Sequence, residues 1–222
     1  IAGCSLAYFL SKYSKSILLI DRNSQVAFGA SGAAGAFLSP LLGKANDFKD
    51  LITKSLIFST NFYKNLGQEL ISNCGVCRIP KNQEDSDKFE SYKPYMDFEY
   101  TQMNDGYFFE IGSQVTPSLI CEKLTKDIEK KLSYNVIKLE QNENFTWIIN
   151  DEICAKNIIL TTGADVKHIK EEYFDIRGVW GQKIDVSTTT ETKINYHKEC
   201  SVSKASKIEN TKFFKVSIGA TH

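Results

Sequence analysis

Four apolar residues at positions 17–20, followed directly by Asp21, form the clearest pattern in the chain. An uninterrupted apolar run of this length is typical of a parallel strand covered on both faces, because such a strand has no solvent face on which polar residues would alternate. The apolar positions between residues 1 and 10 predict a helix before it. Asp21 would then lie at the carboxyl end of the strand, where open parallel sheets bind their ligands.

Apolar and aromatic residues recur at helical spacing between positions 47 and 70, which predicts a long amphipathic helix. Asn46 or Asp47 would cap its amino end. We expect the aromatic stripe of this helix to pack in the core rather than to bind a ligand. After it, residues 76–79 predict a short strand, and the charged segment 81–93 predicts a surface helix or loop.

The second half of the chain contains one predicted helix and many short strands. Thr116, Pro117 and a series of apolar residues as far as Leu132 predict a helix with a hydroxyl cap and a proline in its first turn. Asn150 and Asp151 separate two short apolar runs and predict a β-hairpin. The predicted strands lie at 106–112, 134–139, 146–149, 153–155, 158–161, 177–186, 193–200 and 213–219.

Together these elements predict a mixed α/β and α+β fold, with a parallel sheet and an antiparallel sheet beside it. With 222 residues, 42% of them hydrophobic, the chain is long enough for one large or two small domains. No run approaches the roughly 20 apolar residues of a membrane span, and no leader pattern is seen. The chain starts with Ile rather than Met, so we expect the true amino terminus to be missing, and a removed leader stays open. We expect a soluble, cytoplasmic protein.

The numbers of basic and acidic residues are equal over the whole chain, but one segment has an excess of basic residues. Lys+Arg and Asp+Glu both number 27, which argues against a global field that would attract nucleic acid or membranes. Between Lys193 and Lys215, however, lysines outnumber acidic residues. This segment could contact phosphates, or it could be a solvated strand edge whose lysines discourage pairing with other strands.

The six cysteines are scattered through predicted helices and strands, which indicates reduced thiols rather than a disulfide framework. Cys74 and Cys77 have the spacing of a redox or zinc pair, but two further ligands at short spacing are missing. The three histidines form no ligand-spaced group. We therefore expect no metal site and structural roles for these cysteines.

Three segments are suited to binding a dinucleotide. Gly3 and Asp21 are 18 residues apart, close to the separation of about 20 expected between a Gly-x-Gly-x-x-Gly fingerprint and the acid that binds the ribose. The segment 28–37 contains three glycines and four alanines, so its backbone could approach a flat ligand. Residues 161–163 form a small-residue turn after a predicted buried strand. The alternatives are a packing glycine, a strand-end cap and a flexible linker.

The order of these motifs resembles that of the D-amino-acid oxidase superfamily of FAD-dependent oxidoreductases, over nearly the whole chain. The matching motifs lie at 1–5, 18–22, 30–36, around 136, and at 160–164, 180–182 and 218–221. Within the superfamily, the FAD domain of the MnmC family, which modifies the wobble uridine of bacterial tRNAs, is the most similar, and glycine oxidase is a near relative. The segments that carry this closer resemblance are 35–48, 58–63, 74–76 and 106–118.

The resemblance implies FAD as the cofactor. It implies a Rossmann-like FAD-binding domain made of 1–75 and 133–166, and a substrate domain made of 76–132 and 167–222. The implied cofactor-binding residues are Gly3, Cys4, Asp21, Arg22, Ala30, Ser31, Gly32, Ala33, Ala34, Gly35, Val136, Thr161, Thr162 and Gly163.

Within this set, the resemblance assigns a part of FAD to each group of residues. Gly3 and residues 31–35 would approach the pyrophosphate, the latter also the flavin. Asp21 and Arg22 would bind near the adenosine ribose. Val136 would contact the adenine through its backbone, with residues 162–163 near the ribityl chain.

The resemblance also implies a reaction. The FAD domain would oxidise a secondary amine, removing the carboxymethyl group of carboxymethylaminomethyl-uridine in tRNA as glyoxylate. A methyltransferase domain would be fused or act as a partner. The alternatives are a glycine or D-amino-acid oxidase acting on a free amino acid, and a flavoprotein-like module without turnover.

Two departures from the superfamily bear on the substrate site. The Arg-Gly-Gln motif of the superfamily is replaced by Trp180, Gly181 and Gln182, with Arg177 three positions earlier. These three residues and Tyr196 are expected near the substrate. The chain stops at His222, before the segments that would carry the arginine for the substrate carboxylate, so the catalytic residues are unknown.

Overall fold

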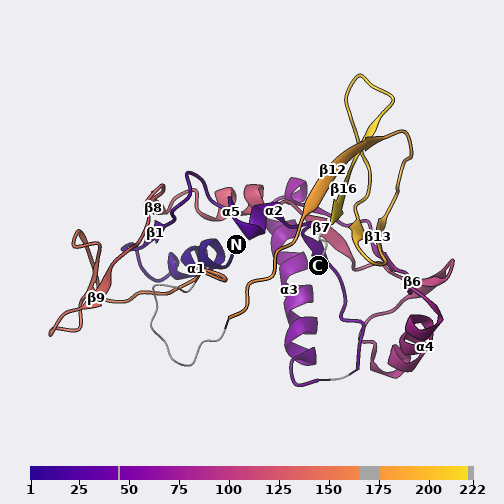
Figure 1. The fold of residues 1–222 in the computed structure, drawn as a ribbon, viewed down its shortest axis with the longest axis horizontal. Coiled ribbons are helices and arrows are strands. Elements are labelled where there is room, and N and C mark those ends of the chain that lie inside the picture. The colour runs from indigo at the N-terminus through magenta and orange to yellow at the C-terminus, as the bar shows by residue number, and fades with distance from the viewer. Residues whose placement is uncertain (45, 166–175, 220–222) are drawn as a thin grey trace. The chain divides into compact units, whose positions relative to one another are not determined.

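The computed structural model describes residues 1–44, 46–165 and 176–219 (Figure 1). Two compact units alternate along the chain. Unit 1 consists of Ile1–Ser31 and Cys121–Trp180, and unit 2 of Gly32–Ile120 and Gly181–His222. Helices, parallel strands and antiparallel strands occur together, which confirms the predicted mixed class. Within the described ranges, no helix combines the length and the apolar character needed to cross a membrane.

The predicted parallel strand is present in unit 1. It is β1 (Leu18–Ile20), which pairs in parallel with β8 (Glu129–Lys131) and follows the predicted helix, α1 (Ala2–Leu10). The Asp21 amide continues the ladder by donating to the carbonyl of Lys131 at 3.1 Å. Asp21 therefore lies where the strand ends, as the sequence predicted.

Three further strands of unit 1 form an antiparallel sheet. They are β9 (Leu139–Gln141), β10 (Trp147–Ile149) and β11 (Ile153–Ala155), with β10 in the centre. The predicted hairpin between the last two is confirmed. Its turn residues Asn150 and Asp151 have φ of 49° and 60°, a left-handed conformation that these residue types adopt more readily than most.

Two strand predictions in unit 1 are wrong. Residues 158–161 form no strand, because no described strand pairs with them, and the two central side chains are about half exposed. Residues 134–138 also lie outside any strand. The amides of Ile137 and Lys138 donate instead to the side-chain oxygen of Asn150, at 2.9 and 3.0 Å. A side-chain acceptor has replaced the strand ladder there.

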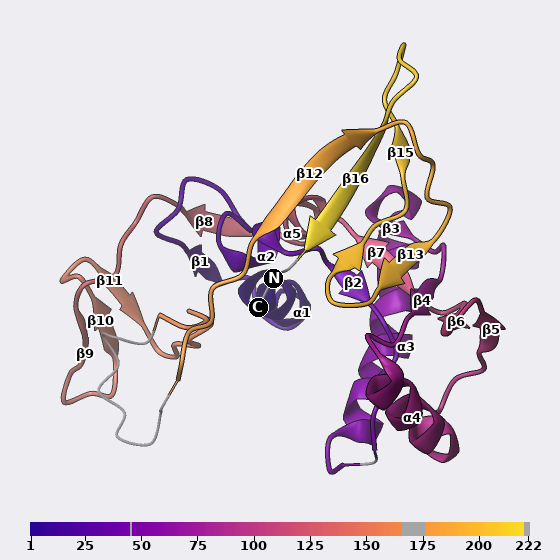
Figure 2. The same cartoon turned by 45° about the vertical axis from the view of Figure 1, so that its right-hand side comes forward.

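An eight-stranded sheet dominates unit 2 and confirms the predicted antiparallel strands (Figure 2). The strands are β4 (Val76–Arg78), β5 (Thr101–Met103), β6 (Gly106–Phe109), β12 (Lys183–Thr188), β13 (Asn195–His197), β14 (Ser201–Val202), β15 (Ser206–Lys207) and β16 (Phe214–Gly219). Seven of them follow the order β12-β16-β14-β13-β4-β6-β5, and β15 pairs with β16. All neighbours are antiparallel except β13 and β4, which are parallel.

A hydrophobic core of unit 2 lies on β4 and β6 under the helix α4 (Gln83–Tyr92). This helix forms in the charged segment, as one of the two predicted alternatives. Its cap is Asn82, whose side-chain oxygen accepts a hydrogen bond from the Asp85 amide at 3.0 Å. Phe89 is the buried residue of α4, and it packs in one cluster with Val76 and other aromatic side chains.

A smaller antiparallel sheet of unit 2 has the order β2-β7-β3. Its strands are β2 (Phe37–Leu38), β3 (Ile71–Ser72) and β7 (Ser113–Val115). The glycine- and alanine-rich segment leads into this sheet through a short helix, α2 (Ala30–Ala33). The side-chain-poor segment is therefore ordered structure rather than a free linker.

The long amphipathic helix is present as α3 (Lys49–Leu66), with two differences from the prediction. The residue before the helix is Phe48, and the Asn46 side chain accepts the Phe48 amide at 2.9 Å, so Asn46 forms the preceding turn rather than the cap. The aromatic stripe is not core, because the buried residues of α3 are Leu56 and Thr60.

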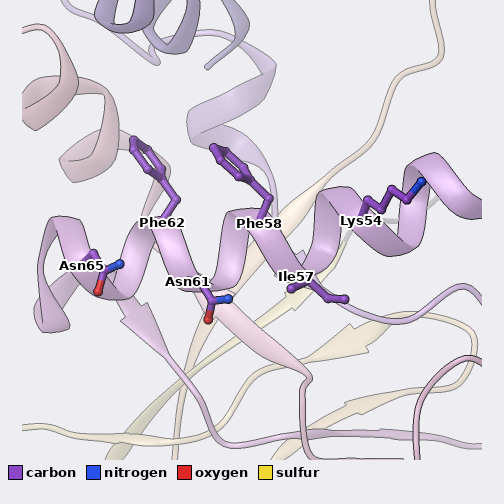
Figure 3. Close-up of a pocket in the computed structure, with 6 residues that line it drawn as sticks. All are labelled: Lys54, Ile57, Phe58, Asn61, Phe62 and Asn65. Carbon is purple, nitrogen blue, oxygen red and sulfur yellow. The ribbon is translucent and has the colours of Figure 1, made fainter.

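Figure 3 shows Phe58 and Phe62 projecting from the same side of α3, with ring centroids 5.6 Å apart and nearly parallel planes. Phe58 is 56% exposed. The stripe follows helical spacing, but the helical period says only which residues share a face and not what covers that face.

The helix predicted from Thr116 to Leu132 ends early, because α5 spans Pro117–Leu124. The amide and hydroxyl of Thr125 both donate to the carbonyl of Cys121, at 3.1 and 2.8 Å. The chain then turns and enters β8. Pairing with β1 has outweighed the helical pattern of the apolar residues beyond the turn.

Candidate functional site

The amino end of α1 brings together two other segments of unit 1. A Cβ atom on Gly3 would lie 2.7 Å from Oγ1 of Thr161 and 3.5 Å from Cδ1 of Leu19, so the absence of a side chain allows this close packing. The backbone nitrogen of Ile1 donates to the Ser31 hydroxyl at 3.0 Å. Thr161 and Ser31 thus lie at a helix end whose N–H groups and dipole favour an anion.

The carboxyl end of β1 contacts the turn that contains Thr161. Arg22 forms an ion pair with Asp165, a residue that no sequence motif indicated. Between Thr161 and Asp165 the chain reverses at Gly163, whose φ of 65° favours glycine. The turn 161–163 is exposed, so its backbone is open to a ligand.

Asp21 has one carboxylate oxygen available for a ligand. The backbone amide and the side-chain amide of Asn23 both donate to Oδ1 of Asp21, each at 2.9 Å, whereas Oδ2 accepts no hydrogen bond from the described residues. A ribose diol could donate to that oxygen. The Tyr134 amide donates to the Asp21 carbonyl at 3.0 Å, which brings the half-buried Val136 toward the same strand end.

The Cys4 side chain is part of the core rather than the surface. It is 6% exposed and packs with Val26 and Cys121, which is fully buried. The two thiols are hydrogen-bonded. This hydrogen bond and burial together raise the pKa of Cys4, whereas the hydrogen bond lowers the pKa of Cys121 to about 7. The part of Cys4 that α1 can present to a ligand is therefore its backbone.

The predicted residues that lead from α2 into β2 differ in their exposure. Residues 32–34 are exposed, whereas Gly35 is buried. A Cβ atom on Gly35 would lie 2.6 Å from the ring of Phe37 and 3.1 Å from the carbonyl oxygen of Gly219. The Gly35 carbonyl accepts a hydrogen bond from the Gln114 side chain at 3.0 Å. Gly35 is thus held by the sheet that follows it.

The residues predicted near the substrate fall into two groups. Trp180, at the end of unit 1, is 94% exposed. In unit 2, Gln182 lies two residues before Ile184, which is in one cross-strand row with Ile218, Val202 and Tyr196. Gly181 and Gln182 directly precede β12, whereas Tyr196 lies on β13 of the same sheet. Ala220 and Thr221, at the end of the last resemblance motif, lie outside the described residues.

Neither a metal centre nor the hollow on α3 competes with this arrangement. Within the described ranges, no group of three or more His, Cys, Asp or Glu residues could hold a metal ion. All six cysteines, including Cys74 and Cys77, are free thiols. The hollow is lined by Lys54, Ile57, Phe58, Asn61, Phe62 and Asn65, and it contains none of the predicted site residues.

A family model described as FAD dependent oxidoreductase matches residues 1–206. The chain belongs to this family of FAD-dependent oxidoreductases. The residues described above fit the family's cofactor. The oxidoreductase has a helix amino end where Gly3 leaves no room for a Cβ atom, and a free carboxylate oxygen of Asp21 at the end of the adjacent strand.

Individual relatives agree with this family. The oxidoreductase is 24% identical to the tRNA 5-methylaminomethyl-2-thiouridine biosynthesis bifunctional protein MnmC of Marinomonas sp., over 208 residues that cover 80% of this chain and 31% of that protein. It thus spans about a third of the length of this relative.

Solved structures share the fold. Glycine oxidase from Geobacillus kaustophilus has a TM-score of 0.75 at 11% identity, and the match covers 99% of this chain and 69% of that one. Iminodiacetate oxidase from Chelativorans sp. has a TM-score of 0.71 at 17% identity, covering 98% and 68%. L-alpha-glycerophosphate oxidase from Mycoplasma pneumoniae, with FAD bound, has a TM-score of 0.73 at 12% identity, covering 98% and 68%.

Proposed function

We propose that this oxidoreductase oxidises a secondary amine, and that its substrate is carboxymethylaminomethyl-uridine at the wobble position of tRNA. The carboxymethyl group would leave as glyoxylate and the aminomethyl nucleoside would remain. Bound FAD supplies the hydride acceptor for this oxidation, and water hydrolyses the imine. The observation that carries the proposal is the similarity to MnmC over 80% of the chain.

The chain's own residues would bind and orient the cofactor. The N–H groups at the start of α1, at Gly3 and Cys4, would hold the pyrophosphate, with the Ser31 hydroxyl beside them. Asp21 would accept hydrogen bonds from the adenosine ribose through Oδ2. The backbone at Thr162 and Gly163 would lie along the ribityl chain.

Lysines on the carboxyl-terminal strands support a nucleic-acid substrate. Lys215 pairs with Asp185 at 3.0 Å, whereas the other five lysines of this segment have no ion pair with a described acidic residue. β15 and β16 lead to the tip of a projecting hairpin in Figure 2, and Lys207 and Lys212 flank that tip. Unpaired, exposed lysines on a hairpin can contact phosphates at little desolvation cost.

A substrate comparison tests the proposal. The FAD-loaded, full-length protein is mixed without oxygen with tRNA that carries the modified uridine, and separately with glycine, sarcosine and D-amino acids. We expect the tRNA to bleach the oxidised flavin absorption and to release glyoxylate. Bleaching by free amino acids alone would overturn the tRNA assignment.

Charge reversal separates binding to tRNA from chemistry. We expect the double variant Lys207→Glu and Lys212→Glu to weaken tRNA binding and to flatten its dependence on salt concentration, because each lost phosphate contact lowers the slope by about one. The matched control is the double variant Lys81→Glu and Lys126→Glu, which makes the same change in net charge at two exposed lysines outside this hairpin. Equal losses in both variants would show that net charge rather than this hairpin attracts the tRNA.

The second candidate is an oxidase of free amino acids. The structural likeness to glycine oxidase favours it, as does the equal number of acidic and basic residues in the chain. In this case the lysine variants would leave turnover unchanged, and glycine or a related amine would reduce the flavin.

A further inference from the structure

Arg78, at the end of β4, has a guanidinium group that is only partly satisfied. Its Nη1 donates to the Ser39 hydroxyl at 3.1 Å. Its Nε is buried and has no partner among the described residues, and Nη2 makes no hydrogen bond with them. Nε and Nη2 point the same way and form the edge of a guanidinium that binds both oxygens of a carboxylate. The side chain is thus fixed at one edge and free at the other.

The charge of Arg78 is also without an ion-pair partner. No described acidic residue lies within ion-pair distance of it. Burial lowers the pKa of the guanidinium, and the charge of Asp85 only partly opposes this effect. The Asp85 carboxylate instead accepts a hydrogen bond from the Lys81 amide at 3.0 Å. A partly buried cation without an ion-pair partner is costly, which makes this position unusual for a purely structural residue.

Two more buried polar groups without partners lie around the same strand. Asn195 is the register partner of Val76 in the parallel β13–β4 pair, and its Nδ2 is unpaired. Ser113 follows Gly112, which packs directly on Val76, and its hydroxyl is unpaired. Asn195 and Ser113 are both 0% exposed.

Arg78 and Asn195 share one face of the sheet at β4. Val76 and Arg78 are two residues apart and therefore face the same side, and Asn195 lies opposite Val76 in register. The segment after β2 lies on that side as well. Its residue Ser39 accepts the hydrogen bond from Arg78, and its residue Leu42 packs on the hydrophobic cluster that contains Val76. Two buried donors without acceptors, Nε of Arg78 and Nδ2 of Asn195, thus lie on one face of β4, where an anion could accept hydrogen bonds from both.

We infer that the Nε–Nη2 edge of Arg78 binds a small carboxylate, with Asn195 on the same face of the sheet completing the subsite and Ser39 orienting the guanidinium. A carboxylate is favoured over a phosphate because one buried guanidinium supplies one positive charge and a planar fork. The inference does not depend on the proposed reaction, because it concerns binding of the anion alone.

Acetate is the probe for this subsite. Thermal unfolding of the full-length protein is followed in sodium acetate and in sodium chloride of equal ionic strength, and acetate binding is measured by saturation-transfer NMR. We expect acetate to raise the unfolding temperature above the chloride value. Arg78→Lys keeps the charge but not the fork, so its acetate affinity should fall about tenfold or more, and Arg78→Met should not respond.

The controls distinguish the subsite from nonspecific effects. Arg177→Met removes an exposed arginine and should respond to acetate as the wild type does. Without acetate, Arg78→Met should be at least as stable as the wild type, because it removes an unpaired buried charge. If acetate and chloride act equally, or if Arg78→Met still responds, the inference is wrong. A response that appears only in Asp85→Asn would show that Asp85 is the partner of Arg78, which would also overturn it.

Discussion

Gly3→Ala perturbs the contact on which the candidate cofactor site depends. The new Cβ atom would lie 2.7 Å from Oγ1 of Thr161, whereas ordinary contacts begin near 3.4 Å, so one of the two segments must move by several tenths of an ångström. Thr161 is β-branched and short, which limits its freedom to rotate away. Overpacking of this kind lowers the free energy of unfolding by about 1–3 kcal/mol. The better helix propensity of Ala offsets up to about 1 kcal/mol of this loss.

The affected contact joins the start of α1 to the turn that would lie along the cofactor. We therefore expect Gly3→Ala to weaken FAD binding by about tenfold, which corresponds to about 1.4 kcal/mol. The assay is titration of the apoprotein with FAD, followed by flavin fluorescence. Gly29→Ala is the matched control, because a Cβ atom there would meet nothing within 4 Å.

A second substitution tests the physical cause. In Gly3→Ala combined with Thr161→Ala the clashing hydroxyl is gone, and the nearest atom of residue 161 is its Cβ at an ordinary 3.7 Å. The double variant should therefore bind FAD as Thr161→Ala does, and the double-mutant cycle should show a coupling of about 1 kcal/mol or more. Unchanged FAD binding in Gly3→Ala, or an equal loss in Gly29→Ala, would refute the reasoning.

Three further predictions concern separate contacts. Asp21→Ala should weaken FAD binding by about 1.5–3 kcal/mol, because it removes a charged hydrogen-bond acceptor, and unchanged flavin occupancy would contradict this placement. Asn82→Ala should lower the free energy of unfolding by about 1 kcal/mol in urea titrations, since it removes the cap of α4; no change would mean that α4 does not contribute to the cooperative transition. The Ser217 hydroxyl and Lys215 lower the pKa of Asp185, so its contribution to stability is present above about pH 4 and is lost as the pH falls through the lowered value. Asp185→Asn should flatten that acid-side loss in unfolding experiments, and an unaltered pH profile would rule out this contribution.

Local signals in the sequence identified the elements around the candidate site. The run before Asp21 predicted β1 because its pattern depends only on neighbouring residues, and the turn at Asn150 and Asp151 was predicted from residue types that tolerate positive φ. Gly3 was singled out by its spacing from Asp21. Its contact with Thr161 connects residues far apart in sequence, so only the structure could show it.

The predictions that failed depended on long-range partners. Residues 158–161 have the composition of a strand, but a strand needs a neighbour, and none of the described strands supplies one. The apolar residues after Leu124 fit a longer helix, yet that stretch pairs with β1 instead. Arg78 was missed because a single arginine in a short strand carries no motif, and its unpaired edge is visible only when its surroundings are known.

The parallel pairing of β13 with β4 has a consequence for synthesis of the chain. β4, β5 and β6 leave the ribosome roughly a hundred residues before β13, which at 5–20 residues per second means a delay of roughly 5–20 s. Throughout that interval the outer edge of β4 has no partner and offers its backbone to any passing strand. Nascent chains should therefore be most vulnerable to misassembly before residue 197 emerges, and a chaperone that shields this edge would act in that window.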